Sequence, residues 1–158
     1  MTTEEKIKVI LSHIENVQRN TNKLGLKLIA KGEIKLGQTL IANGLIHDNS
    51  KLRGIEFEHL FFDSVLLVDA IKHHQQTNPH HPEYWPNGIH DMPDVYLAEM
   101  ACDILARSQE FGQDIKLWIR EEATKKYVFR LDDICGIKLL YYINLILDKN
   151  FKELKENS

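Results

Sequence analysis

Apolar positions recur along this chain at the three- and four-residue spacing of amphipathic helices, and the alternation typical of strands is weak throughout. The first predicted helix carries an apolar stripe at Ile7, Ile10, Ile14 and Val17. Thr2 or Thr3 can cap it, and Glu5 stands three residues after Thr2 at capping-box spacing. Leucines at 24 to 28 continue this helix or start another, because Gly25 leaves both options open. Gly32 is a suitable stop.

The rest of the chain follows the same periodicity. Further helices are predicted at about 33–46, 55–62, 63–78, 93–111, 114–127 and 132–153. The second helix has its apolar side at Ile34, Leu40, Ile41 and Leu45. The fourth carries Val65, Leu66, Val68 and Ile71. Residues 78–92 hold three prolines and a glycine, which predicts a loop, and Pro93 suits the first turn of the next helix. The pattern therefore predicts an all-α, compact bundle of about six to seven helices.

Length and composition agree with an ordinary globular chain. The 158 residues suit a single domain, 1–158, in which the polar residues 153–158 form a frayed tail. The net charge of -3 disfavours an extended nucleic-acid surface. The amphipathic start predicts no signal peptide, and no run reaches the roughly 18 apolar residues of a membrane span. Cys102 and Cys135 lie in apolar helical patterns, so we expect both to be reduced and buried in a cytoplasmic protein.

Candidate chemistry is concentrated in two segments. One is the dipeptide His47-Asp48, followed by Lys51, and the other is residues 73–90, which hold five of the eight histidines. Imidazole and carboxylate groups are ligands for divalent metals. The candidate ligands are spread over several predicted helices and the loop, in the order His13, His47, Asp48, His74, His80, His81 and Asp103. This set offers enough donors for two ions bridged by the carboxylate of Asp48, an arrangement suited to displacement at phosphorus.

The ordered set resembles the HD-domain superfamily of metal-dependent phosphohydrolases, which is all-α. That motif is a histidine, an adjacent His-Asp pair and a distal aspartate, and its dinuclear members insert two further histidines. More narrowly, His74-x3-Asn78-Pro-His-His-Pro-Glu-Tyr-Trp85 followed by Glu99-Met-x-x-Asp103 looks like a family of small, largely uncharacterised bacterial and phage proteins. The resemblance covers about residues 13 to 110. It implies bound divalent ions, two in dinuclear members, chosen from Mn, Fe, Co, Ni, Mg or Zn.

The sequence departs from that pattern in three respects. Ser50 stands where many dinuclear members have glycine before the lysine, and the interval from Asp48 to Asp103 is short. The doubled histidines at 73–74 and 80–81 leave the ligand of each pair open, although His74 fits the family spacing better than its neighbour.

Other polar residues admit structural interpretations. His90-Asp91 is a second His-Asp dipeptide, and it is interpreted as capping the helix after Pro93. Asp103, beside an apolar stripe, can pair with a metal or with Arg107 one turn later. Glu83 either orients a histidine or is an exposed acid. Tyr84 and Trp85 either stack on a nucleobase or pack the loop. The lysine pair 125–126 and the lysines of 149–155 are interpreted as solvated, and His59 as structural.

Three functional hypotheses follow. The preferred one is a phosphomonoesterase or phosphodiesterase in which Asp48 and Lys51 are catalytic, Lys51 neutralising a phosphate. Analogy with the superfamily makes a small phosphorylated substrate, of nucleotide type, the expected partner. The second is an HD-type di-iron oxygenase, whose ligands and lysine are similar. The third is a non-catalytic metal-binding or interaction module. The sequence does not distinguish the oligomeric state.

Overall fold

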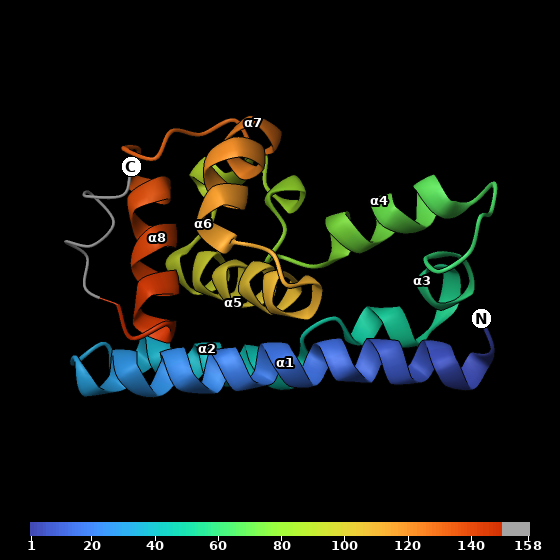
Figure 1. The fold of residues 1–158 in the computed structure, drawn as a ribbon, viewed down its shortest axis with the longest axis horizontal. Coiled ribbons are helices and arrows are strands. Elements are labelled where there is room, and N and C mark those ends of the chain that lie inside the picture. The colour runs from blue at the N-terminus through green and yellow to red at the C-terminus, as the bar shows by residue number, and fades with distance from the viewer. Residues whose placement is uncertain (150–158) are drawn as a thin grey trace.

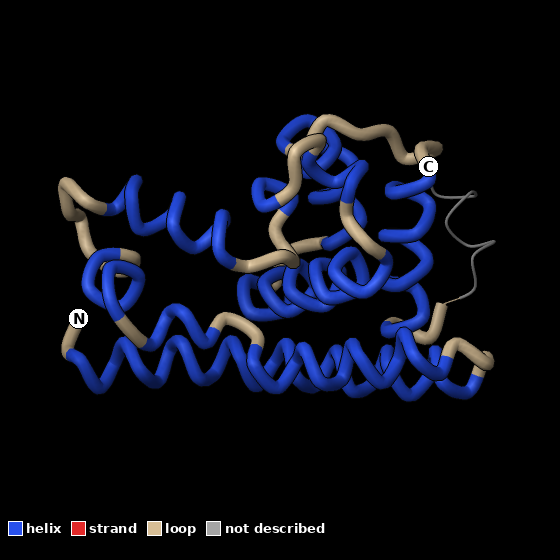
Figure 2. Tube along the Cα trace, turned by 180° about the vertical axis from the view of Figure 1, so that it is seen from behind, coloured by secondary structure: helices blue, strands red, loops and turns tan. Residues whose placement is uncertain are grey.

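The computed structural model describes residues 1–149, and these residues form helices joined by turns and loops, with no strand among them (Figures 1 and 2). The helices are α1 Thr3–Ala30, α2 Ile34–Ile46, α3 Gly54–His59, α4 Leu67–Thr77, α5 Asp94–Phe111, α6 Ile115–Trp118, α7 Thr124–Lys126 and α8 Ile134–Ile146. A π-helical turn, Ile119–Ala123, joins α6 and α7 into one continuous segment, which gives seven helices within residues 1–149. The predicted all-α class is confirmed.

Helix α1 runs the length of the molecule, and α2 folds back along its C-terminal half (Figure 1). The leucines after Gly25 continue α1, and the capping box between Thr2 and Glu5 is present. Gly32, with φ of 91°, makes the turn into α2. The two helices approach closely where Gly25 faces Gly37, because a Cβ on Gly25 would lie 2.8 Å from the Gly37 carbonyl oxygen. Small residues at this crossing let the two backbones pack in direct contact.

The hydrophobic core lies where α5 packs on α1, α2 and α8. Both cysteines are buried and free, Cys102 in α5 and Cys135 in α8, as expected. Trp85 packs against this core, and its indole nitrogen donates a hydrogen bond to the carbonyl of Pro79. That bond fixes the loop of residues 78–92, which contains two short 3-10 turns, Pro82–Tyr84 and Gly88–Asp91.

Helices α3 and α4 form an arm above the N-terminal half of α1, at the opposite end of the molecule from α8 (Figure 1). Helix α4 begins at Leu67, later than the predicted start at 63, and it packs mainly on α3 and the loop. Val65 is 97% exposed, and Val68, Leu66 and Ile71 are also exposed. What α4 buries instead is Ala70 and His74.

Several other expectations need correction at single positions. Ile7 on α1 and Ile34 and Leu45 on α2 face solvent, and their helices turn Lys6, Gly37 and Gly44 inward instead. Helix α3 ends at His59 instead of Phe62, and Pro93 precedes the first turn of α5 instead of lying in it. Helix α8 ends at Ile146, and the tail predicted for 153–158 lies outside the described residues. Across residues 1–149, no helix is both long and apolar enough to cross a membrane.

Candidate metal centre

The sequence-predicted ligands meet at one place from five separate segments. His13 comes from the middle of α1, and His47 and Asp48 come from the end of α2. His74 lies in the last turn of α4, the pair at 80–81 in the following loop, and Asp103 in α5. Asp48 is buried and has a left-handed backbone with φ of 55°. Aspartate tolerates this conformation better than most residues, and here it ends α2 so that the carboxylate turns into the protein.

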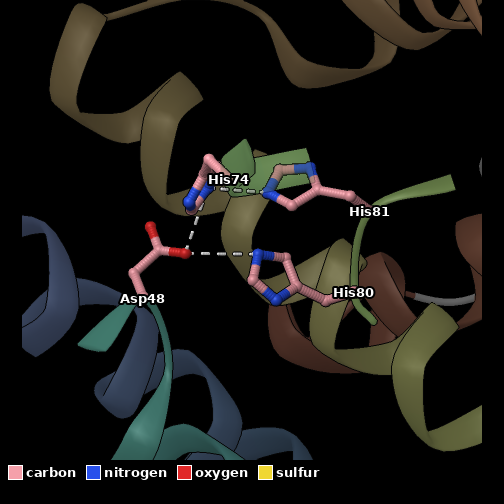
Figure 3. A group of neighbouring side chains, drawn as sticks. All are labelled: Asp48, His74, His80 and His81. Atoms are coloured by element: carbon pink, nitrogen blue, oxygen red, sulfur yellow. Dashed lines mark hydrogen bonds and ion pairs between the residues drawn. The ribbon is translucent and has the colours of Figure 1, made fainter. Parts of the chain in front are cut away.

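One group, the Asp48 cluster, consists of Asp48, His74, His80 and His81, whose ligand atoms all lie within 4.8 Å of one another. Figure 3 shows the three rings around the carboxylate. The Nε2 atoms of His74 and His80 lie 3.4 Å and 3.3 Å from Asp48 Oδ1. His81 Nε2 lies 2.9 Å from His74 Nε2. Two imidazole nitrogens this close share either a proton or a cation, so the arrangement suits metal coordination.

The neighbouring group, the Asp103 cluster, consists of His13, His47 and Asp103. His13 Nε2 lies 2.9 Å from Asp103 Oδ1, and His47 Nε2 lies 3.8 Å from the same oxygen. Both histidines also approach Asp48, His13 Nε2 at 3.6 Å from Oδ2 and His47 Nε2 at 3.6 Å from Oδ1. Asp48 therefore lies between the two clusters and can contribute a carboxylate oxygen to each.

Three glutamates hold the far nitrogens of these histidines. Glu99 lies 2.9 Å from His47 Nδ1 and 3.3 Å from His80 Nδ1. Glu110 lies 2.9 Å from His13 Nδ1, and Glu56 lies 2.8 Å from His74 Nδ1. A carboxylate that accepts the Nδ1 proton fixes the tautomer and aims the Nε2 lone pair at the centre, as outer-shell carboxylates do for metal-bound histidines.

The sequence interpretation missed these three orienting residues. Glu99 appears in the motif Glu99-Met-x-x-Asp103 but was given no role; it lies one helical turn before Asp103, on the same side of α5, and that spacing could have indicated one. Glu56 is fully buried in the short α3. No motif in the sequence around it indicates a functional role. Glu110 lies 97 positions from His13, a pairing that only the fold reveals.

Several of the buried atoms that face the centre have no hydrogen-bond partner among residues 1–149. Buried atoms in this condition include His13 Nε2, His47 Nε2, His80 Nε2 and Asp48 Oδ1. Buried polar atoms are normally satisfied, and each unsatisfied one costs about 1–3 kcal/mol. Their convergence on one point is the condition that a bound cation relieves, and the imidazole and carboxylate donors fit a divalent transition metal such as manganese.

Electrostatics divide the site into two parts. Burial acts to lower the pKa of His47, but the charge of Asp48, the nearby carboxylate of Asp103 and the hydrogen bond with Glu99 outweigh it and raise that pKa to about 10. Burial opposes ionisation of Asp48 as well, yet the charges of His47 and Lys51 hold its pKa well below the usual value. This half of the site therefore has ionised carboxylates that require positive charge, supplied by protons or by metal.

The other half favours neutral imidazole. Burial and the charge of His80 lower the pKa of His81 to about 3. Burial also lowers the pKa of His74, and the charge of Lys51 adds to the effect against the opposing influence of Asp48. Neutral imidazole is the form that binds a metal, so these two side chains need lose no proton to coordinate one.

A cavity of about 400 Å³ opens beside the clusters. Lys51, His74, His81 and Asp103 form its inner wall. Its remaining wall is made by Ile104, Arg107, Ser108, Phe111, Gln113, Trp118, Lys126 and Tyr127. Lys51 is almost fully buried, and its ammonium group donates to Asp48 Oδ2 at 2.6 Å. Lys126, interpreted from the sequence as purely solvated, thus lines the cavity together with two other cationic side chains.

The remaining histidines lie apart from the centre. His73 is half-exposed and lies 2.7 Å from Glu56 Oε1, so His74 is the member of that pair that faces Asp48. At 80–81 both members face it. His59 lies 2.9 Å from the Ser64 hydroxyl, as a structural residue would.

The capping role predicted for His90-Asp91 is wrong, and three alternatives that the sequence left open are decided. Asp91 does not cap α5, because its carboxylate accepts hydrogen bonds from Asn87. Arg107 pairs with Glu110, and Asp103 contacts histidines instead. Glu83 is exposed, accepts a hydrogen bond from a glutamine and orients no histidine. Tyr84 and Trp85 pack the loop and are not among the lining residues of the 400 Å³ cavity.

Comparison with known proteins gives one match. A family model described as a family of unknown function (DUF5662) matches residues 60–135. The matched segment contains His74, His80, His81 and Asp103, whereas His13 and the His47-Asp48 pair precede it. No curated protein and no solved structure matches the chain. The resemblance to HD domains therefore rests on the order of ligands in the sequence, and what stands from the fold is an all-α protein with buried His/Asp/Glu clusters suited to metal ions.

Proposed function

We propose that this chain is a metal-dependent phosphohydrolase that acts on a small phosphorylated substrate. The observation that carries the proposal is the set of buried, unpartnered Nε2 and carboxylate atoms that converge while glutamates hold the opposite nitrogens. A group of histidines that served only the core would have both nitrogens satisfied. The order of these ligands along the chain, which resembles that of HD domains, agrees with the proposal.

The donor set suits two divalent ions. The Asp103 cluster would hold one and the Asp48 cluster the other, with Asp48 shared between them. When bound, such a pair supplies Lewis acidity toward a phosphoryl oxygen and lowers the pKa of a water molecule. Glu56, Glu99 and Glu110 keep the imidazole rings in the coordinating tautomer. Asp48 and Lys51 are the proposed catalytic residues, the lysine offering its charge to the substrate.

The lining of the cavity supports a phosphorylated substrate. Lys51, Arg107 and Lys126 bring positive charge to its wall, which favours an anion. Phe111, Trp118 and Tyr127 line the same space, and aromatic side chains can stack on a nucleobase. A phosphate near Lys51 and a base against the aromatic residues would fill the cavity, which makes a nucleotide the proposed substrate type.

The test begins with metal analysis of protein purified without chelator. A panel of mono- and diesters is then assayed for phosphate or alcohol release, with each candidate metal restored to stripped protein. We expect hydrolysis that depends on added metal, of which manganese, cobalt, nickel or magnesium would each be acceptable. Consumption of dioxygen by an iron-loaded protein, without phosphoester cleavage, would instead establish the oxygenase. A stable protein without metal would favour a binding module.

A variant pair tests the role assigned to Lys51. Lys51→Met keeps the aliphatic stem and removes the charge, so kcat/KM should fall by about tenfold or more while the metal content stays the same. Lys125→Met is the matched control, because Lys125 is exposed and does not line the cavity. Equal activity of the two variants would remove Lys51 from the mechanism.

A further inference from the structure

Another cluster of metal-ligating side chains lies away from the Asp48 and Asp103 clusters of the proposed active site. It consists of His90, Asp133 and Cys135, whose ligand atoms lie within 4.8 Å of one another, and is called here the His90 cluster. His90 comes from the 3-10 turn Gly88–Asp91, and the other two stand at the start of α8. Cys135 Sγ lies 3.7 Å from His90 Nδ1. The sequence interpretation had assigned His90-Asp91 only a capping role.

The imidazole of His90 is oriented in the way that metal-bound histidines are. Its Nε2 lies 3.0 Å from the carbonyl oxygen of Val128, so the Nε2 proton is donated to the backbone and the Nδ1 lone pair faces Cys135. Val128 has φ of 53°, a conformation that a β-branched residue adopts only under constraint. The surrounding structure therefore holds the carbonyl at the position that fixes the tautomer of His90.

The surrounding charges favour a cation. Asp133 Oδ2 accepts a hydrogen bond of 2.7 Å from the backbone N–H of Arg130, which fixes this carboxylate at the start of α8. Two nearby cationic side chains are paired with other acids, Arg130 with Asp132 and Lys138 with Asp94. A cavity of about 540 Å³ reaches the cluster from outside, and it shares no lining residue with the 400 Å³ cavity.

We propose that His90, Asp133 and Cys135 bind a divalent ion of the zinc type, at a site independent of the Asp48 and Asp103 clusters. Thiolate, imidazole and carboxylate together select a borderline metal such as Zn²⁺, and three protein ligands leave one tetrahedral position for water. The ion would join the loop of residues 78–92 to α8, the two segments that flank the core on this side. By joining these two segments it would support the loop that also carries His80 and His81.

Cobalt provides a probe specific to this site, because the proposed active site contains no cysteine. A cobalt ion bound to thiolate gives charge-transfer absorption in the near ultraviolet, whereas one bound only by nitrogen and oxygen ligands does not. Metal-stripped protein is titrated with Co²⁺, and we expect this absorption to reach a plateau whose amplitude corresponds to one thiolate-bound ion per chain, whatever the Asp48 and Asp103 clusters bind in addition. A folded wild-type protein that never shows the absorption would overturn the proposal without any variant being made.

Variants assign the signal to the proposed ligands. Cys135→Ser should abolish it, whereas Cys102→Ser, at the buried cysteine of α5, should leave it unchanged. His90→Ala should weaken Co²⁺ binding by at least about tenfold. Asp91→Asn, at the adjacent residue that contacts Asn87, is the matched control and should bind normally. Absorption that persists in Cys135→Ser would contradict the assignment.

The two sites can fail separately. His80→Ala should reduce the total Co²⁺ bound and abolish hydrolysis while retaining the thiolate absorption. If no phosphoester is cleaved under any condition, the thiolate signal still decides whether the His90 cluster binds metal. Conversely, hydrolysis by a protein that lacks the signal would support the proposed function and exclude the second site.

Discussion

Asp48 combines a buried charge with a left-handed backbone, and these two properties can be tested separately. Asp48→Asn keeps a side chain that tolerates positive φ but removes the charge that balances His47 and Lys51. We expect metal affinity to fall by at least about tenfold and hydrolysis to be lost. Isothermal titration with Mn²⁺ and far-ultraviolet circular dichroism would show weaker binding by a folded protein.

Asp48→Ala is the comparison that isolates the backbone. It loses the same charge but also has to place alanine in the left-handed region, at a cost of about 1–2 kcal/mol. In metal-free protein the alanine variant should therefore unfold at a lower urea concentration than the asparagine variant. Equal midpoints would mean that the left-handed conformation stores no strain.

Glu56 gives a prediction about positioning. It accepts one hydrogen bond from the Ser50 hydroxyl and contacts two histidines, and its side chain is fully buried. Glu56→Gln retains the shape but replaces one acceptor oxygen with a donor, so His74 loses its preferred tautomer. We expect metal affinity to fall about 10–100-fold.

The control for that substitution is Glu83→Gln, in an exposed residue of the same type. It should bind metal as wild type does. If Glu56→Gln does not fold, Glu110→Gln tests the same principle at His13 from a more exposed position. A glutamine variant at Glu110 with unchanged affinity would show that the far nitrogen does not need a carboxylate.

At the scale of residues, the sequence predicted those side chains whose type is typical of metal ligands, histidine and aspartate. The Asp48 and Asp103 clusters contain no residue that was not already a candidate, because histidine and aspartate in order along helices are visible without a fold. The glutamates were missed because glutamate is common on helix surfaces, and burial of Glu56 and Glu99 depends on contacts 17 to 52 positions away. The His90 cluster was missed because His90 and Cys135 are 45 positions apart in the sequence and meet only in the fold.

At the scale of elements, the crossing of α1 and α2 decides where His13 and His47 meet. Gly37 approaches the carbonyl oxygen of Gly25 so closely that no Cβ fits between the backbones. Gly37→Ala should force the helices apart and lower the free energy of unfolding by about 1–3 kcal/mol. Urea denaturation monitored by circular dichroism measures this change, and metal affinity should fall with it.

Gln38→Ala is the matched control for that crossing. Gln38 is the next residue on α2 and faces solvent, so alanine there should change the unfolding free energy by no more than about 0.5 kcal/mol. A Gly37→Ala variant as stable as this control would show that the two helices can separate without cost.

Periodicity located the helices better than it located their buried faces. It placed α2 and α5 correctly to within a few residues, because the helix-breaking residues Gly32, Pro93 and Gly112 stand at their ends. The apolar positions that it marked around α4, Val65, Leu66, Val68 and Ile71, face solvent, and α4 buries Ala70 and His74. An apolar stripe indicates that one face of a helix favours burial. Which face actually meets the core depends on packing among elements that are distant in the sequence.

At the scale of the whole molecule, the Asp48 and Asp103 clusters connect the α3–α4 arm to the core formed by α1, α2, α5 and α8. His74 on α4 contributes to the same cluster as Asp48, while His13 and Asp103 belong to α1 and α5. Removal of the metal leaves buried carboxylates and imidazoles facing one another, with little apolar packing to hold α4 in place. We therefore expect the arm to open before the core formed by α5 and α8.

Chelation followed by hydrogen exchange tests this expectation. The experiment uses the Cys135→Ser variant, so that only the Asp48 and Asp103 clusters respond to the chelator. Metal at about 100 times its dissociation constant stabilises a protein by about 2.7 kcal/mol, and loss of the metal should lower the unfolding temperature accordingly. Amide protection should fall in α4 while α8 remains protected, because α8 contributes no ligand to either cluster. Equal loss in both helices would mean that the arm and the core unfold as one unit, with the metal stabilising the protein as a whole.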